Sequence, residues 1–293
     1  MTFKNKTLLL VVGAARSGTS WYYHYCKDHP QIGVSPIKDI HYFDQLYGDR
    51  KAFKKIWKTD WRKAERKLER MKARGKSKPT LIQEQFEVAD VLRRRLELLN
   101  GDPATNNKYY EFIEHYTKNH NVFADITPAY ALLTAHQFKE IKSTHEKIKV
   151  IFLMRDPVNR FYSQIRLGEK TSKSNKNVQN IKAIKNFEKI LKRPERTARG
   201  DYKNIITQLE TVFDPNELHY VFYENLFSDD GIKGICEFLD VDFRPGKYSD
   251  KINFAENQKP IPPKLAKLAR LHFADIYDFC RHKFNDVPES WMK

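Results

Sequence analysis

The sequence contains few cysteines and no long apolar run. Only Cys26, Cys236 and Cys280 occur among its 293 residues, and no two of them are closely spaced. This sparse, odd set argues against a disulfide framework or a cysteine zinc site, so buried apolar thiols are expected. The longest apolar run near the N-terminus, Leu8 to Ala15, is too short to cross a bilayer or to form a signal-sequence core. These absences favour a soluble, cytoplasmic protein without a transmembrane segment.

Acidic residues are in the minority. The chain has 53 Lys and Arg against 37 Asp and Glu, a formal net charge of +16. Such an excess attracts nucleotides, nucleic acids, acidic polysaccharides or acidic membrane surfaces without choosing among them. A non-catalytic polyanion-binding protein, held to its partner by charge, is therefore one candidate function. The sequence has no RNA-stacking motif, so nucleic acid is not the expected partner.

Four short runs of apolar or β-branched residues predict buried strands. Helical patterns separate these runs, which is typical of βαβ units with a parallel sheet. The predicted strands are Leu8–Val12, Val122–Ile126, Val150–Met154 and Leu218–Tyr223. The predicted helices are Thr19–Lys27, Leu132–Lys142, Pro157–Leu167, Tyr202–Val212, Ile232–Leu239 and Pro263–Lys283. We therefore expect an α/β fold in which residues 1–293 form one domain.

Two basic segments, at about residues 46–120 and 169–199, are predicted to be insertions into this pattern. The first contains a basic helical pattern over Lys51–Lys78 that breaks at Gly75–Pro79, and the second contains the polar stretch Lys170–Asn180. Both are consistent with solvated faces, and together they could also flank a groove for an acidic acceptor.

The stretch from Leu8 to Tyr25 predicts a phosphate-binding loop. A buried strand ends at Gly13, a loop follows, and a helix begins near Gly18. Loop amides and a helix N-terminus form an anion site, and Thr19 and Ser20 add hydroxyl donors. The spacing Gly13-x-x-x-x-Gly18 matches the nucleotide-triphosphate loop, but Thr19 occupies the position of its lysine. The cation lies earlier in the loop instead, at Arg16, which weakens a kinase interpretation.

A second anion site is predicted after the strand Val150–Met154. Arg155 follows this strand at its carboxyl end, where open α/β sheets bind ligands. Asp156 and Pro157 are suited to start a helix, whose polar side carries Ser163. The arginine fork can donate two hydrogen bonds to phosphate oxygens. Two phosphate sites on separate βα units fit a nucleotide phosphorylated at both its 3′ and 5′ positions.

These two motifs resemble those of sulfotransferases that use 3′-phosphoadenosine 5′-phosphosulfate (PAPS). The run GAARSGTSW, from Gly13, is similar to their 5′-phosphosulfate loop, and the Arg155 and Ser163 pair is similar to their 3′-phosphate motif. The resemblance covers residues 7–45, 122–168 and 198–262, and it implies a P-loop NTPase-like central parallel sheet flanked by helices, with basic helical insertions.

The resemblance also implies roles for individual residues. Arg16 would contact the bridging oxygen and the leaving phosphate, and Arg155 and Ser163 would bind the 3′-phosphate. Lys259 is a candidate third nucleotide contact. The 5′-phosphate would be cradled by Ser17, Gly18, Thr19 and Ser20.

The segment SPIKDIHYFD, Ser35 to Asp44, resembles an acceptor-site motif of heparan-sulfate and related carbohydrate sulfotransferases. Asp39 occupies the position of their glutamate general base. His41 and Asp44 match positions that contact the acceptor or orient the site. Lys38 could balance charge on the sulfuryl oxygens. The sequence departs from the family at Ile126, where relatives often carry a lysine.

These observations predict a sulfotransferase that moves a sulfuryl group from PAPS to a hydroxyl, on an oligo- or polysaccharide, by in-line displacement. Asp39, or His41, would take the acceptor proton, because an alcohol is a poor nucleophile until it is deprotonated. The product nucleotide would be 3′,5′-adenosine bisphosphate (PAP), and no metal is required. Two alternatives stay open, namely a metal-dependent P-loop kinase with Asp125 as a magnesium ligand and the non-catalytic polyanion-binding protein.

Overall fold

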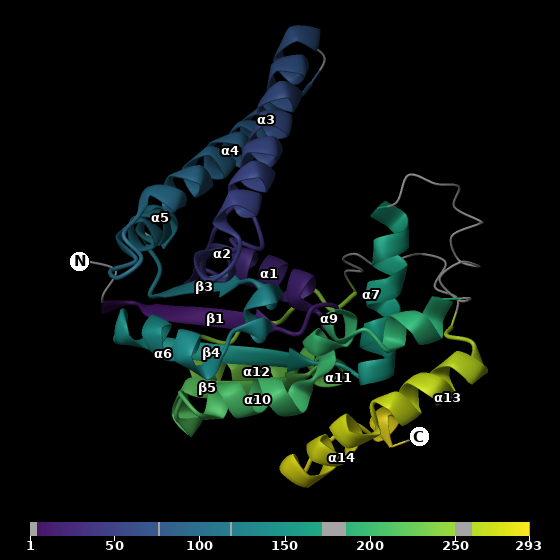
Figure 1. The fold of residues 1–293 in the computed structure, drawn as a ribbon. Coiled ribbons are helices and arrows are strands. Elements are labelled where there is room, and N and C mark those ends of the chain that lie inside the picture. The colour runs from purple at the N-terminus through teal and green to yellow at the C-terminus, as the bar shows by residue number, and fades with distance from the viewer. Residues whose placement is uncertain (1–4, 76, 118, 172–185, 250–259, 293) are drawn as a thin grey trace.

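The computed structural model describes residues 5–75, 77–117, 119–171, 186–249 and 260–292, and it shows an α/β fold built on one parallel sheet (Figure 1). The strands are β1 (Thr7–Gly13), β2 (Ile32–Val34), β3 (Val122–Ile126), β4 (Ile148–Met154) and β5 (Leu218–Phe222). The α-helices are α1 (Thr19–Asp28), α2 (Tyr42–Leu46), α3 (Arg50–Arg74), α4 (Pro79–Glu97), α5 (Asn107–Thr117), α6 (Ala135–Ser143), α7 (Pro157–Thr171), α9 (Pro194–Thr197), α10 (Tyr202–Glu210), α11 (Tyr223–Leu226), α12 (Asp229–Leu239), α13 (Pro263–His272) and α14 (Ala274–Lys283). Short 3₁₀ helices are η2 (Leu98–Asn100), η3 (Pro128–Leu132), η4 (Ala198–Gly200), η5 (Pro215–Glu217) and η6 (Glu289–Trp291).

All strand pairs in the described part of the chain are parallel, in the order β2-β3-β1-β4-β5. The four predicted strands are present, which confirms the predicted sheet. The sequence reasoning missed β2, because a strand of three residues centred on Gly33 is too short to show a period. It also placed Tyr223 in the last strand, whereas this residue begins α11.

The central strand β1 is apolar because both of its faces are covered. Leu8 and Leu10 pack on one face, Leu9 and Val11 pack on the other, and all four side chains are fully buried. Helices α1 and α12 cover the second face, and α5, α6, α7 and α10 cover the first. Full burial of a Leu or Val side chain contributes about 1.5–3 kcal/mol. This packing fixes the carboxyl edge of the sheet, where the loops after β1, β3, β4 and β5 lie.

The first predicted insertion, at about residues 46–120, contains a helical hairpin of α3 and α4, and its last helix, α5, packs in the core. The basic helix is α3, which ends at Arg74, and the predicted break is confirmed because Gly75 caps α3 in the left-handed conformation with φ 62°. Helix α4 returns beside α3, and the pair projects away from the sheet (Figure 1). In the second insertion, the stretch Lys170–Asn180 lies largely outside the described residues.

The C-terminal helix prediction was wrong in one respect. Residues 263–283 form two helices, because Phe273 leaves the helical conformation (φ −97°, ψ 14°) and turns its ring into the core. His272, the last residue of α13, is exposed. All three cysteines are free and buried, as expected. Within the described residues, no helix has both the length and the hydropathy that a membrane span needs.

Candidate functional site

The predicted phosphate loop lies between β1 and α1, and the two neighbouring elements η3 and α11 pack against it. A Cβ on Gly13 would lie 3.0 Å from Ala131 Cβ, so η3 passes directly over the start of the loop. A Cβ on Gly18 would lie 2.6 Å from Leu226 Cδ2, so α11 closes over its end. Gly18 also has φ 88°, a conformation that disfavours other residues. Close approach therefore favours glycine at position 13, and the backbone angle favours glycine at position 18.

Several donors in this loop lack partners within the described protein. Helix α1 begins at Thr19 with no side-chain cap, which leaves its first amides available. The Ser17 hydroxyl is fully buried and has no hydrogen-bond partner among the described residues. Buried hydroxyls are rarely left unpaired, and an anion at a helix N-terminus satisfies such donors. Arg16 has φ 75°, and strained backbone of this kind concentrates at functional sites.

Arg155 reaches the same loop from the end of β4. Its NH1 donates to the backbone carbonyl of Arg16 over 3.1 Å. Its guanidinium lies over the Tyr223 ring, 4.5 Å from the ring centroid. The Tyr202 hydroxyl holds the backbone of Arg155, donating to its carbonyl over 2.6 Å and accepting from its amide over 3.2 Å. The strand end, α10 and α11 together therefore position this arginine.

Arg16 contacts the second predicted phosphate motif directly. Its Nε donates to Ser163 Oγ over 3.0 Å, so the loop after β1 and the helix after β4 meet at one place. Burial lowers the pKa of Arg16, and the positive charges of Arg155 and Arg166 lower it further. No carboxylate in the described parts of the chain forms an ion pair with these three arginines. A group of guanidinium charges that forms no ion pair with a carboxylate of the described residues favours a bound polyanion.

The nearest carboxylate to Arg155 in sequence serves a different purpose. Asp156 is buried, and its Oδ1 accepts from the Asn159 amide over 2.8 Å, which caps α7. Its Oδ2 accepts from the Tyr277 hydroxyl over 2.5 Å. Since both oxygens are occupied by structural donors, Arg155 remains available to a ligand.

The predicted acceptor residues lie beside the end of β3, the strand next to β1. The Asp39 amide donates to the Ile126 carbonyl over 3.3 Å, which anchors the segment to the strand end. Lys38 Nζ lies 2.7 Å from Asp39 Oδ1. Asp39 (φ 61°) and His41 (φ 59°) both have left-handed backbone angles. Because β3 and β1 are parallel neighbours, this segment and the phosphate loop share one edge of the sheet.

His41 and Asp44 form a pair across the first turn of α2. Nδ1 of His41 lies 2.7 Å from Asp44 Oδ2. A carboxylate accepts only, so Nδ1 carries the proton and Nε2 keeps its lone pair in the neutral ring. The imidazole is thus held in the tautomer that a general base needs.

Tyr130 supports this pair from the turn after β3. Its hydroxyl accepts from the amides of Tyr42 and Phe43 over 3.1 and 3.4 Å, and so caps α2. It donates to Asp125 Oδ2 over 2.9 Å. Asp125 is fully buried and also accepts from Thr127, so it is occupied within the protein. Burial raises the pKa of Asp125 to about 6, although its hydrogen-bond donors oppose this shift.

The comparisons with known proteins agree with this geometry. A model of the sulfotransferase family matches residues 9–245. The chain belongs to the sulfotransferase family.

Two solved structures share the fold of this sulfotransferase. The first is a sulfotransferase from Alicyclobacillus acidocaldarius, with a TM-score of 0.62, 16% identity, and coverage of 97% of this chain and 98% of the other. The second is the sulfotransferase domain of the olefin synthase from Synechococcus PCC 7002, with a TM-score of 0.54, 19% identity and 95% coverage of both chains. Both support a P-loop NTPase-like fold. No match was found among curated proteins.

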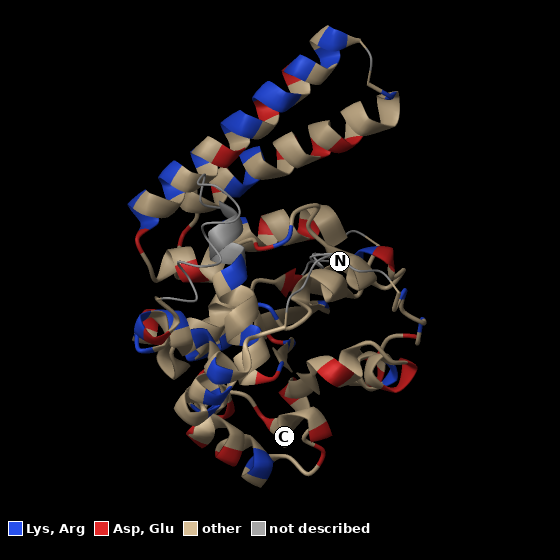
Figure 2. Ribbon diagram, turned by 90° about the vertical axis from the view of Figure 1, so that its right-hand side faces the viewer, with Lys and Arg blue, Asp and Glu red and all other residues tan. Residues whose placement is uncertain are grey.

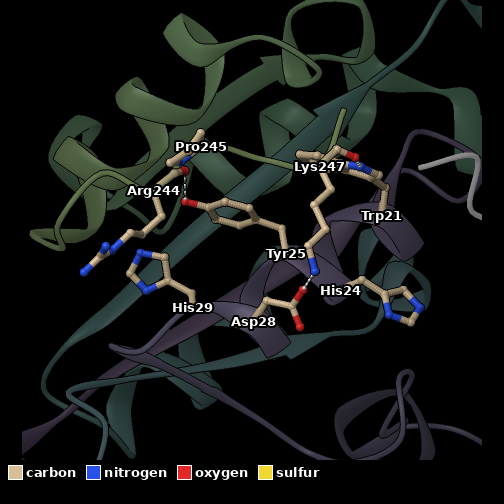
Figure 3. Close-up of a pocket in the computed structure, with 8 residues that line it drawn as sticks. All are labelled: Trp21, His24, Tyr25, Asp28, His29, Arg244, Pro245 and Lys247. Atoms are coloured by element: carbon tan, nitrogen blue, oxygen red, sulfur yellow. Dashed lines mark hydrogen bonds and ion pairs between the residues drawn. The ribbon is translucent and has the colours of Figure 1, made fainter. Parts of the chain in front are cut away.

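The sulfotransferase has a small cavity beside α1 (Figure 3). It lies between α1 and the segment 244–247, where Tyr25 donates to the Arg244 carbonyl over 3.0 Å and Trp21 Nε1 donates to the Lys247 carbonyl over 3.1 Å. Its volume is about 70 Å³. Since ligand pockets are typically about 300–1,000 Å³, this cavity cannot hold a nucleotide.

Some residues of the site were missed by the sequence reasoning. The sequence patterns predict Tyr223 as the end of a strand and give no role to Tyr130, and Arg95 lies in the first predicted insertion. Arg95 is buried, and its NH2 lies 3.2 Å from Asp60 Oδ2. Burial lowers the pKa of Arg95, while the charges of Asp60 and Asp39 raise it, which places Arg95 near the acceptor segment. The sequence around Arg95 reads as an ordinary helix and gives no local signal that this arginine lies near the acceptor segment.

Two further observations concern Lys259 and metal binding. Lys259, the proposed third nucleotide contact, lies outside the described residues. Among the residues that the structure describes, no group of three or more His, Cys, Asp or Glu side chains is arranged to hold a metal ion.

Proposed function

We propose that this sulfotransferase uses PAPS as its donor and transfers the sulfuryl group to a hydroxyl of a carbohydrate. The observation that carries the donor assignment is the meeting of the two predicted phosphate motifs, in which Arg16 contacts both Ser163 and Arg155. A nucleotide with phosphates at its 3′ and 5′ positions fits two adjoining anion sites, whereas ATP needs only one.

The residues present fit such a donor. The buried, unpaired Ser17 hydroxyl and the uncapped N-terminus of α1 suit the 5′-phosphate, together with Gly18, Thr19 and Ser20. Arg155 and Ser163 suit the 3′-phosphate. Arg16, next to both, suits the oxygen that bridges sulfur and the leaving phosphate. Preorganised positive charge at that oxygen stabilises the negative charge that develops there in the transition state.

When bound, PAPS supplies the sulfuryl group. In an in-line displacement, the acceptor oxygen forms a bond to sulfur while the bond from sulfur to the bridging phosphate oxygen breaks, and PAP leaves. The acceptor proton passes to His41 Nε2 or to the Asp39 carboxylate. The pairing of His41 with Asp44 supports His41 as the base. Lys38, whose ammonium group lies beside the Asp39 carboxylate, would balance charge on the sulfuryl oxygens.

The carbohydrate acceptor is proposed from the segment Ser35–Asp44, which resembles the acceptor motif of carbohydrate sulfotransferases. Its exposed fractions are consistent with substrate contact, since the side chains of Asp39 and His41 are 40% and 32% exposed. No metal has a role in this scheme.

Calorimetric titration with PAP and with ATP tests the donor assignment. We expect PAP to bind at least about tenfold more tightly than ATP without added metal, because it fills both anion sites. Transfer from radiolabelled PAPS to a panel of sugar acceptors should follow. Magnesium-dependent ATP turnover without PAP binding would instead support a kinase.

A further inference from the structure

The two helices of the projecting hairpin differ strongly in charge. Helix α3 carries 12 Lys and Arg against 3 Asp and Glu, whereas α4 carries 3 against 4. Figure 2 shows basic residues recurring along α3 as far as the tip of the hairpin, with acidic residues more evident on α4. The net positive charge of the hairpin therefore comes from α3.

The basic residues of α3 include a continuous exposed row. Its members follow one another at steps of three or four residues, the spacing of neighbours on one helix face. They are Lys51, Lys55, Lys58, Arg62 and Arg66, and all five are exposed. From Lys51 to Arg66 the row spans about 22 Å, at roughly 1.5 Å per residue. The opposite face of α3 is apolar and packs on α4 through Trp57, Ala64 and Leu68.

This basic row of α3 forms no ion pair with a carboxylate of the residues that the structure describes. Of the cations on α3, Lys72 forms an ion pair in the described part of the chain, with Glu69, and no member of the row does. On α4 the situation is reversed, since Arg93 and Arg94 both pair with Asp90. A solvent-exposed helix without a binding role typically carries acidic residues between its basic ones, as α4 does. The row instead presents positive charge that no ion pair of the described chain compensates.

The base of the hairpin touches the predicted acceptor residues. The Phe53 ring, in the first turn of α3, lies 6.0 Å from the His41 ring between centroids. The guanidinium group of Arg95, on α4, stacks on Trp57 at 4.9 Å from its ring centroid. Burial lowers the pKa of Arg95 and the negative charge of Asp39 raises it, which indicates that the Arg95 and Asp39 side chains interact electrostatically. The row therefore begins within one helical turn of a residue that packs against His41.

We propose that the basic row of α3 is a docking surface for an acidic polysaccharide, whose carboxylate or sulfate groups pair with successive turns of the helix. The placement of one of its hydroxyls at His41 or Asp39 rests on the proposed function, whereas binding along α3 does not. A long linear polyanion matches a row of several turns better than a compact anion does. A membrane is a poorer fit, because the apolar face of α3 is already buried against α4. Nucleic acid is a poorer fit, because Trp57 is buried and the row carries no aromatic ring for base stacking.

A pair of charge-matched variants tests this surface in the full chain. The row variant is Lys55→Gln/Lys58→Gln/Arg62→Gln. The control is Lys27→Gln/Lys139→Gln/Lys147→Gln, which removes the same charge from exposed lysines on α1, on α6 and in the loop just before β4. Binding of labelled dextran sulfate, hyaluronan and neutral dextran is measured at several salt concentrations, beside single-stranded DNA and phosphatidylglycerol vesicles. PAP titration and circular dichroism accompany every protein.

We expect the row variant to bind dextran sulfate at least about tenfold more weakly than wild type, with the slope of log K against log salt reduced by roughly 3. The control should change by less than about threefold, and PAP affinity should be equal in all three proteins. Equal losses in both variants, or tighter row-dependent binding of DNA or vesicles than of either polysaccharide, would overturn the proposal. Absence of PAP binding to wild type would count against the donor assignment alone.

Discussion

Arg155 donates a hydrogen bond from NH1 to the backbone carbonyl of Arg16, although 139 residues separate the two in sequence. This contact brings the proposed anion sites after β1 and β4 into one place. Arg16 in turn reaches Ser163, so a single bound molecule can engage both motifs. The following predictions test what these contacts contribute to binding and catalysis.

Replacement of Arg155 should weaken nucleotide binding. Hydrogen bonds to charged groups contribute about 1.5–3 kcal/mol, so Arg155→Ala should raise the Kd for PAP by roughly 10- to 100-fold. Calorimetry measures this directly. Arg281→Ala, which removes an exposed arginine from α14, serves as the control and should leave PAP affinity unchanged. Equal Kd values for Arg155→Ala and wild type would contradict the assignment of the 3′-phosphate site.

Replacement of Arg16 should affect catalysis more than binding. Loss of one preorganised charge at the leaving oxygen costs about 10²–10³ in rate, so Arg16→Ala should lose at least that factor in kcat. Arg16→Lys keeps the charge but not the fork that reaches Ser163, and it should retain intermediate activity. Initial rates at saturating PAPS make the comparison. Wild-type rates in Arg16→Ala would remove this residue from the mechanism.

The identity of the base can be decided by three substitutions. Removal of a general base typically costs about 10²–10⁴ in rate. If His41 is the base, His41→Ala should show this loss in kcat, Asp44→Asn a smaller one, and Asp39→Asn the least. The reverse order, with Asp39→Asn most affected, would assign the base to Asp39. PAP affinity should be unchanged in all three variants. Full activity in both His41→Ala and Asp39→Asn would exclude both residues as the general base.

Tyr130 should contribute to both stability and rate. In Tyr130→Phe two amides of α2 and a buried carboxylate lose their shared partner, which we expect to lower the free energy of unfolding by about 1–3 kcal/mol per unsatisfied group. Urea denaturation measures this loss. Tyr116→Phe, at a partly buried tyrosine, should change stability by less than about 0.5 kcal/mol. A loosened α2 should also lower kcat without changing PAP affinity.

Asp125 should make stability depend on pH. Its folded pKa of about 6 lies above the ordinary value of 3.8, so between these values the native state binds more protons than the unfolded state. Stability should therefore fall as pH rises through about 6, by at most about 3 kcal/mol from this group. Comparison of wild type with Asp125→Asn from pH 4 to pH 7 isolates the effect, and ¹³C NMR of the carboxyl gives its pKa. A flat difference across this range would contradict the prediction.

Much of the fold could be predicted because its signals are local. β1 and β4 are continuous apolar runs since both faces of the sheet are covered, and the loops that follow them carry glycines, a helix cap and a cation within a few residues. The three-residue strand β2 and the break at Phe273 could not be predicted, because neighbouring elements rather than local patterns determine them.

The sequence by itself determined which chemical groups are present and where along the chain they lie, namely Arg16 in a glycine loop, Arg155 after a strand, and the Lys38–Asp44 segment. Only the tertiary structure decided which of them meet. The parallel order of β3, β1 and β4 places three strand ends side by side, Ser163 orients Arg16, and Tyr130 orients the helix that holds His41. Contacts over more than 80 residues depend on how helices and strands pack, and no local pattern encodes them.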